Sequence, residues 1–238
     1  MDRRRFIASA GGLVLGGAFG GAALAKTESS LRMPSKACKA TLRTTPGPFR
    51  TLSPLRADIR EDRIGVPLKL SVKVVNDFSC EAMAGIPVEI WQCDAAGIYS
   101  NVVNMVFDHA TLRPVGDGPD TRGQMFLRGY QLTDERGMVD FTTIFPGWYT
   151  ARVPHIHLRA VAGGAEWTAH DTQLFFDEKI ERAVFASGAY AARGPNPLSP
   201  ERDLVLHGDR SMLKALTVPL AKDGDGYRGN FELAMQSL

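Results

Sequence analysis

The sequence lacks several patterns that would assign a function at once. Its three cysteines, Cys38, Cys80 and Cys93, include no C-x-x-C pair, so their spacing does not resemble a structural zinc site. No stripe of lysine and arginine argues for a nucleic-acid partner. No internal repeat or low-complexity segment follows the first 25 residues. These absences direct attention to single globular domains.

The first residues have the composition of an export signal. Arg3, Arg4 and Arg5 precede an apolar stretch that ends in Ala23-Leu24-Ala25, an A-x-A-like cleavage site. A transmembrane anchor is the alternative, but six glycines make this stretch only weakly hydrophobic. The paired arginines resemble a twin-arginine signal, which exports folded proteins. We therefore predict a signal at 1–25, cleavage after Ala25, and a periplasmic or extracellular protein with no membrane attachment after cleavage.

Removing the signal changes the charge and permits a disulfide. The formal net charge falls from +2 to about zero, since the signal holds three arginines and one aspartate. Export makes a disulfide permissible, and an odd cysteine count leaves at least one thiol without an intrachain partner. Cys80 and Cys93 are the preferred pair because they flank one predicted strand. Three free buried thiols are the alternative.

The rest of the chain predicts an all-β fold. Residues 26–60 are polar and rich in proline and are expected to form an extended N-terminal arm, and residues 61–238 are expected to form a single β-sandwich domain. Alternating apolar residues and turn signals predict an antiparallel β-sandwich with long loops. The predicted strands are Leu68–Val75, Ile86–Trp91, Met138–Ile144, Trp148–Val153, Ile156–Val161, Thr172–Phe176, Asp203–His207 and Tyr227–Leu233. Asn101–Gln124 is expected to be a loop over the site, and Glu178–Ser187 a short helix.

The densest group of potential metal ligands is Pro154-His155-Ile156-His157-Leu158. Residues two apart on a strand point to the same side, so His155 and His157 would present two imidazoles to one point while Ile156 and Leu158 face the core. Imidazole suits zinc, copper, iron and nickel. Taken alone, an H-x-H pair is as often two incidental histidines.

Three nearby residues have ordinary explanations when considered singly. Tyr99 and Tyr149 are typical of strand ends, where the ring is buried and the hydroxyl reaches water. Arg152 is typical of a solvated surface charge. Their order along the chain is more specific than any one of them.

Together these segments resemble the intradiol ring-cleavage dioxygenases, which include protocatechuate 3,4-dioxygenase and the catechol 1,2-dioxygenases. The resemblance runs from about Pro46 to Phe176. It rests on Val88-Glu89-Ile90-Trp91-Gln92-Cys93-Asp94-Ala95-Ala96-Gly97-Ile98-Tyr99, on Phe145-Pro146-Gly147-Trp148-Tyr149, and on Arg152-Val153-Pro154-His155-Ile156-His157.

The resemblance implies a function for each matching residue. Tyr99, Tyr149, His155 and His157 match the four ligands of a non-haem Fe(III). Arg152 and Gln173 match an arginine and a glutamine beside the iron, and Tyr149 is also expected to take up a substrate proton. Trp91 and Ile98 are expected in the substrate pocket. The implied reaction uses O2 to open a catechol-type ring between its two hydroxyl-bearing carbons, giving a cis,cis-muconate-type dicarboxylic acid without an organic cofactor.

The sequence also departs from the best-known members. Only five residues separate Tyr149 from His155, and Thr150 and Ala151 follow Tyr149, where protocatechuate 3,4-dioxygenase has a longer loop and a tryptophan two positions on. The choice of catechol and the oligomeric state therefore stay open, with a compact, open pocket as the hypothesis. A cupin site is disfavoured because no glutamate follows His157 within a few residues. An exported β-sandwich binding module or an inactive relative of the dioxygenases is the alternative function.

Overall fold

A computed structural model describes residues 38–163, 168–186 and 188–236, and every structural statement concerns these residues. The predicted signal and its cleavage after Ala25 lie outside them. In this part of the chain, no helix combines the length and the apolar character needed to span a membrane.

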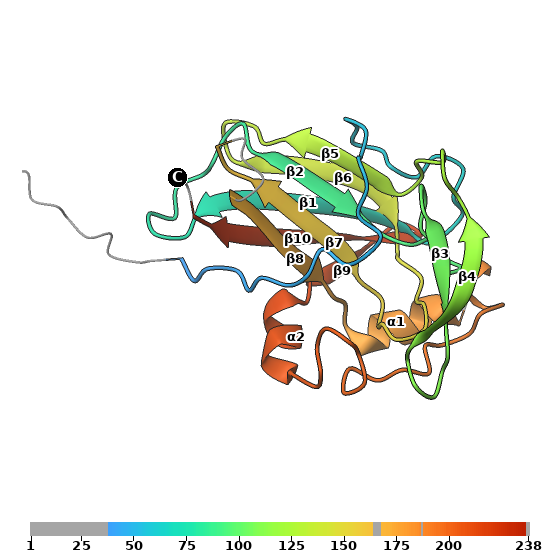
Figure 1. The fold of residues 1–238 in the computed structure, drawn as a ribbon. Helices are drawn as coiled ribbons and strands as arrows, with labels where there is room; N and C mark the ends of the chain where they lie inside the picture. Colours follow the sequence, from blue (N-terminus) through green and yellow to red (C-terminus); the bar gives the residue numbers. More distant parts are fainter. Residues whose placement is uncertain (1–37, 164–167, 187, 237–238) are drawn as a thin grey trace, which may run out of the picture. The chain divides into compact units, whose positions relative to one another are not determined.

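Two four-stranded sheets form the body of the domain, as Figure 1 shows. The first sheet has the order β6-β1-β10-β9, and the second has the order β5-β2-β7-β8. The strands are β1 (Pro67–Asn76), β2 (Pro87–Trp91), β5 (Arg128–Leu132), β6 (Met138–Ile144), β7 (Ile156–Val161), β8 (Ala169–Leu174), β9 (Leu220–Asp223) and β10 (Gly226–Met235). The predicted all-β sandwich is confirmed, although β1 and β10 pair in parallel within otherwise antiparallel sheets.

The core lies between the two sheets and fixes which face of each strand points inward. Leu68, Leu70, Val72 and Val74 alternate along β1 and are all buried in it. The second sheet contributes apolar side chains from β2, β7 and β8, namely Val88, Ile90, Ile156, Leu158, Ala160 and Leu174. Burying one such side chain contributes about 1.5–3 kcal/mol, so a one-residue slip of β7 would be costly. This register leaves the alternate residues of β7 on the outer face.

Two short helices lie below β8 and β9 in the view of Figure 1. The predicted helix at 178–187 is confirmed over α1 (Glu178–Phe185), which begins after the N-cap Asp177. A second helix, α2 (Arg210–Leu216), begins after Asp209, whose side chain accepts from the amides of Ser211 and Met212. Such caps satisfy amides that have no partner within the helix.

Three local predictions were wrong. Trp148–Val153 is not a strand but a turn that contains only an isolated bridge between Tyr149 and Arg152. Asp203–His207 is also a turn, because the Asp203 carboxylate accepts from the amides of Val205 and Leu206 and curls the backbone around itself. The predicted loop at 101–124 contains the hairpin β3 (Val103–Phe107) and β4 (Pro114–Asp120), which does lie beside the candidate site.

The preferred disulfide was also wrong. Cys80 pairs with Cys38, with 5.3 Å between their Cα atoms, whereas Cys93 is a buried free thiol. The predicted pair, Cys80 and Cys93, flanks β2, and a strand separates its ends by about 3.3 Å per residue. That places them beyond the roughly 7 Å that a disulfide can span.

The arm crosses the second sheet in an extended conformation (blue in Figure 1). Its backbone amides donate in turn to the carbonyl oxygens of Ala234, Asp171 and Tyr130. Isolated β-bridges join Leu55 to Tyr130 and Asp58 to Thr142. The arm therefore covers the outer face of the sheet that carries β7. Its predicted bounds, 26–60, stay a prediction.

Candidate metal centre

His157 lies in β7 and His155 directly precedes this strand, and both are buried. Ile156 and Leu158 point into the core between the sheets, as the strand period requires. The imidazoles therefore share the outer face, and their Nε2 atoms lie 3.1 Å apart. The Nδ1 atom of His155 lies 2.7 Å from the carbonyl oxygen of Val153. A proton on that Nδ1 leaves the lone pair of Nε2 directed at the shared point.

Tyr99 is fixed at the end of a tight turn after β2. The Asp94 carboxylate accepts from the amides of Ala96 and Ile98, and Gly97 has a φ of +82°. A Cβ at Gly97 would lie 2.3 Å from the carbonyl oxygen of Trp148, so only glycine fits there. The turn delivers the Tyr99 hydroxyl to within 3.3 Å of the His155 Nε2.

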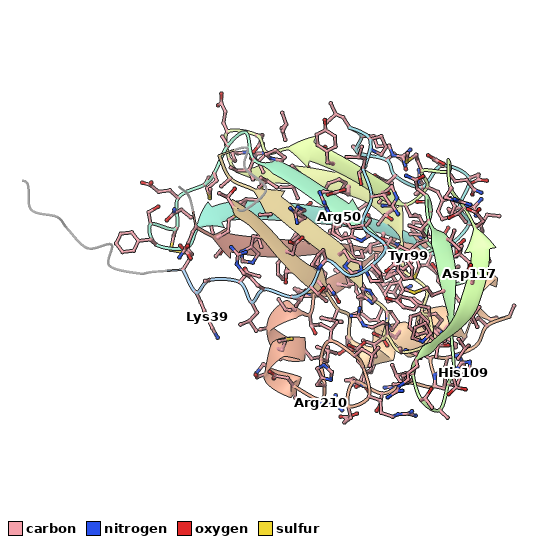
Figure 2. The ribbon with its side chains drawn as sticks, in the orientation of Figure 1. Lys39, Arg50, Tyr99, His109, Asp117 and Arg210 are labelled. Carbon is pink, nitrogen blue, oxygen red and sulfur yellow. A yellow bond between two sulfur atoms is a disulfide. The ribbon has the colours of Figure 1, made fainter. Side chains whose placement is uncertain are left out.

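The Tyr99 backbone and ring are both held in place. Asn104 accepts from the Tyr99 amide at 2.8 Å and donates to its carbonyl oxygen at 2.9 Å. The Phe49 ring stacks on the Tyr99 ring with 4.6 Å between centroids. Tyr99, which is labelled in Figure 2, is fully buried.

Tyr149 reaches the same point from the turn at 148–151 and is only partly buried. Its ring centroid lies 5.7 Å from that of Tyr99 and 5.8 Å from that of His155. Phe107 of the β3–β4 hairpin lies on another side, at 6.1 Å. The structure thus brings together all four residues predicted as metal ligands.

The spacing of the donor atoms fits a common cation. Ligands about 2.1 Å from one ion lie roughly 3.0 Å apart at right angles and roughly 3.4 Å apart at tetrahedral angles. The distances of 3.1 Å between the His155 and His157 Nε2 atoms and 3.3 Å from His155 to the Tyr99 hydroxyl fall in this range. Among the described residues, no group of three or more His, Cys, Asp or Glu side chains could hold a metal. The tyrosine oxygens are therefore essential to this donor set.

Burial sets the protonation of the four side chains. It lowers the pKa of His155 and His157 well below the ordinary value, with Arg152 adding to the effect, so both imidazoles are neutral and free to bind a cation. Burial raises the pKa of Tyr149 to about 12 and that of Tyr99 well above its usual value. Only a strong Lewis acid would hold these phenols as phenolates near neutral pH. Two hard anionic oxygens favour Fe(III) over softer or less charged cations.

Arg152 borders the four candidate ligands, and its guanidinium is held from three directions. Nη1 lies 3.3 Å from the His155 Nε2, Nη2 donates to the Gln173 side chain, and Nε donates to the Asp203 carboxylate at 3.0 Å. Burial alone would lower the pKa of Arg152, but the Tyr149 and Asp203 oxygens raise it above its ordinary value. Arg152 is therefore a fixed positive charge at the site.

Gln173 and Trp91 join this site through the pairing of the second sheet. The register aligns Arg128, Trp91, His157 and Gln173 across four neighbouring strands. The Trp91 ring stacks on the His157 ring with 4.7 Å between centroids, and Gln173 donates to the carbonyl oxygen of Thr45 in the arm. Trp91 is fully buried, so it supports His157 from behind.

Ile98 does not join the site. Its side chain packs against a separate apolar cluster formed by Phe126, Leu127 and Ile144. Ile98 precedes Tyr99 in the chain, and the turn that directs Tyr99 inward directs its neighbour to the opposite side.

The arm itself was predicted, but its contact with the site was not, and neither was the position of Asp203 beside Arg152. A Cβ at Gly47 would lie 3.2 Å from the Cε1 atom of His157, which shows how closely the arm covers the site. The segment Pro46-Gly47-Pro48-Phe49 could have indicated such a close approach. Asp203 carried no comparable signal, since nothing distinguishes it from the other aspartates before the fold is known.

Comparisons with known proteins identify the family of this chain. A family model described as Dioxygenase matches residues 50–193. An intradiol ring-cleavage dioxygenase from Tetranychus urticae is similar in structure, with 30% sequence identity, coverage of 84% of this chain and 96% of the other, and a TM-score of 0.70.

More distant structures share the fold. The dioxygenase domain of a dioxygenase carbohydrate-binding protein fusion from Streptomyces sp. SirexAA-E has 23% identity and a TM-score of 0.56, covering 84% of this chain and 100% of the other. A hydroxyquinol 1,2-dioxygenase from Pseudomonas putida DLL-E4 has 18% identity and a TM-score of 0.55, covering 86% and 69%. The comparison with curated proteins gave no match. With the family model and the Tetranychus urticae structure in agreement, the chain belongs to the intradiol ring-cleavage dioxygenase family.

Proposed function

We propose that this protein is a non-haem Fe(III) dioxygenase that opens a catechol-type ring between its two hydroxyl-bearing carbons. Both atoms of O2 would enter the product, a cis,cis-muconate-type dicarboxylic acid, so the reaction needs no further reductant. The observation that carries the proposal is the convergence of Tyr99, Tyr149, His155 and His157 on one buried point. Fe(III) held by these four residues would supply a Lewis acid that polarises a bound catechol.

The two tyrosines would have different functions. Tyr99 is fully buried and its backbone is fixed on both sides by Asn104, so it suits a permanent ligand. Tyr149 lies on a partly exposed turn and can move without disturbing a strand. When a catechol binds, the Tyr149 side chain would move aside, and its oxygen would accept a proton from the substrate.

Arg152 would stabilise negative charge that develops on the substrate ring. Its guanidinium is already oriented by Asp203 and Gln173 before any substrate arrives. A preorganised charge in a water-poor site acts more strongly than the same charge in water. Gln173 links this arrangement to the arm through the carbonyl oxygen of Thr45.

We also propose that the protein acts outside the cytoplasm. The support is the basic, glycine-rich start of the sequence together with the Cys38–Cys80 disulfide, which persists in oxidising compartments. A cytoplasmic location would leave this disulfide exposed to reduction.

The deciding experiment is a visible spectrum with metal analysis of the exported protein, followed by assays with catechol, protocatechuate and hydroxyquinol. We expect a red-brown protein that binds a single iron, because phenolates bound to Fe(III) absorb visible light, and turnover of at least one of the three compounds. A colourless protein holding zinc or no metal would contradict the iron assignment and favour a binding module. An iron-loaded, coloured protein that turns over none of them would contradict the compact catechol pocket.

A further inference from the structure

A small cavity lies beside the metal centre and is separate from its four candidate ligands. Its volume is about 210 Å³, and it lies between the tip of the β3–β4 hairpin, the turn at 148–151 and the segment at 196–202. The lining residues are His109, Leu112, Trp148, Thr150, Ala151, Asn196, Pro197, Leu198 and Arg202. Figure 2 shows His109 at the end of the hairpin.

One turn of the chain borders both the metal centre and the cavity. Trp148 and Thr150 flank Tyr149 in the chain, and Ala151 precedes Arg152. Asn196 donates to the carbonyl oxygen of Arg152 at 3.1 Å, which ties the far wall of the cavity to the same turn. The wall of the cavity is therefore continuous with the turn that places Tyr149 and Arg152 at the metal centre.

The lining is apolar at its base and positively charged at one edge. Leu112 and Leu198 supply apolar surface, and no lining residue carries a carboxylate. Arg202 donates to the carbonyl oxygens of His109 and Ala110 at 3.4 and 3.2 Å. Within the described residues Arg202 forms no ion pair, in contrast to the exposed arginines that pair with neighbouring acids.

The polar groups at this edge suit an anionic ligand. An arginine held by carbonyl oxygens keeps its full charge and has other N–H groups free to donate to a carboxylate. His109 lies beside it, with its ring nitrogens 3.5 Å from the Thr150 hydroxyl. The cavity is smaller than the roughly 300–1,000 Å³ of sites that hold a whole ligand, so it suits part of one.

We propose that this cavity binds the side chain of a substituted catechol that ends in a carboxylate, with Arg202 and His109 contacting the carboxylate. The inference rests on the proposed function, since the metal centre would hold the ring. The substrate class is then a catechol with a short, flexible, acidic side chain, and Arg202 determines the preference for it.

Binding in the absence of oxygen tests this preference independently of turnover. The iron-loaded full chain is titrated under nitrogen with 3,4-dihydroxyphenylacetate and 3,4-dihydroxyphenylpropionate, and with the methyl ester of each. We expect an acid to bind about tenfold more tightly than its own ester, the size expected of a charge-assisted hydrogen bond. Arg202→Gln retains an amide that can donate to the hairpin carbonyl oxygens, but it removes the positive charge. The ratio of the affinity for the acid to the affinity for its ester should therefore fall to near one.

Arg136→Gln is the matched control, because Arg136 is an exposed arginine on another turn and pairs with Asp134. It should leave the ratio unchanged. Equal binding of acid and ester by the wild type, or an unchanged ratio in Arg202→Gln, would overturn the proposal while leaving the dioxygenase function intact. Failure to open any catechol in air would instead contradict the proposed function, whatever the binding ratio.

Discussion

The two halves of the metal centre are built on different kinds of structure. His157 and Trp91 lie on paired strands, and Tyr99 lies at the end of the tight turn that follows β2. Tyr149 and Arg152 instead lie on a turn that is held by Asp203 from a distant segment. The first group, Trp91, Tyr99 and His157, is called the sheet half, and its positions depend on the hydrogen bonds that form the fold. The second group, Tyr149 and Arg152, is called the turn half, and its positions depend on a few side chains. This difference suggests that the sheet half retains the metal and the turn half performs the movements of catalysis.

The largest expected effect comes from removing a ligand of the sheet half. His157→Ala should abolish iron binding and the visible colour, because the remaining donors lose one of two neutral imidazoles and β7 cannot shift to replace it. Iron content and the visible spectrum of the purified variant measure this. His170→Ala is the control, since His170 is also buried and lies on the adjacent strand β8 but outside the site. Full iron occupancy in His157→Ala would contradict the ligand assignment.

A smaller effect is expected from the tyrosine of the turn half. Tyr149→Phe should keep iron and fold normally but lower kcat by about 100-fold, in the range for loss of a positioned acid or base. Tyr99→Phe should lose most of its iron, because its environment offers no substitute ligand. Steady-state kinetics together with metal analysis separate the two outcomes, with Tyr130→Phe as a control remote from the metal. Equal iron loss in both variants would remove the distinction between the two halves.

The sheet half was predictable from sequence because its geometry follows from a local rule. A period of two places His155 and His157 on one face, and the apolar Ile156 and Leu158 between and after them identify the buried side. The resemblance to a known family then supplied the tyrosines, Arg152 and Gln173. The strands β1, β2, β6, β7 and β10 were predicted for the same reason, since each alternates over a buried face.

The turn half was not predictable in the same way. Trp148–Val153 has the composition of a strand, but Ala151 adopts a φ of +78°, and the Asp203 carboxylate accepts from the Val153 amide just after it. That contact joins residues 50 positions apart, and no local pattern specifies it. The Cys38–Cys80 disulfide and the stacking of Phe49 on Tyr99 are of the same type, because both depend on where the arm crosses the sheet.

The smallest effect on catalysis, and the sharpest test of the comparison, is expected at Asp203. Its carboxylate accepts from Arg152 Nε and from the amides of Val153, Val205 and Leu206, and it is fully buried. In Asp203→Asn, an NH2 group replaces one carboxylate oxygen, so it faces the N–H donors of either Arg152 and Val153 or Val205 and Leu206. The Arg152 guanidinium also loses its negatively charged partner. Breaking a buried ion pair in this way should cost about 3 kcal/mol of unfolding free energy.

Catalysis by Asp203→Asn should fall about tenfold in kcat with little change in KM, because Arg152 loses its orientation while the metal and its ligands remain. Asp209→Asn is the matched control, since asparagine caps a helix as well as aspartate does and α2 should be unaffected. Kinetics measured well below the melting temperature, with iron content and the visible band recorded on the same sample, separate a positioning effect from unfolding. A variant that is destabilised but retains wild-type kcat would show that Asp203 only stabilises the turn, and that Arg152 is oriented by Gln173 and the sheet half instead.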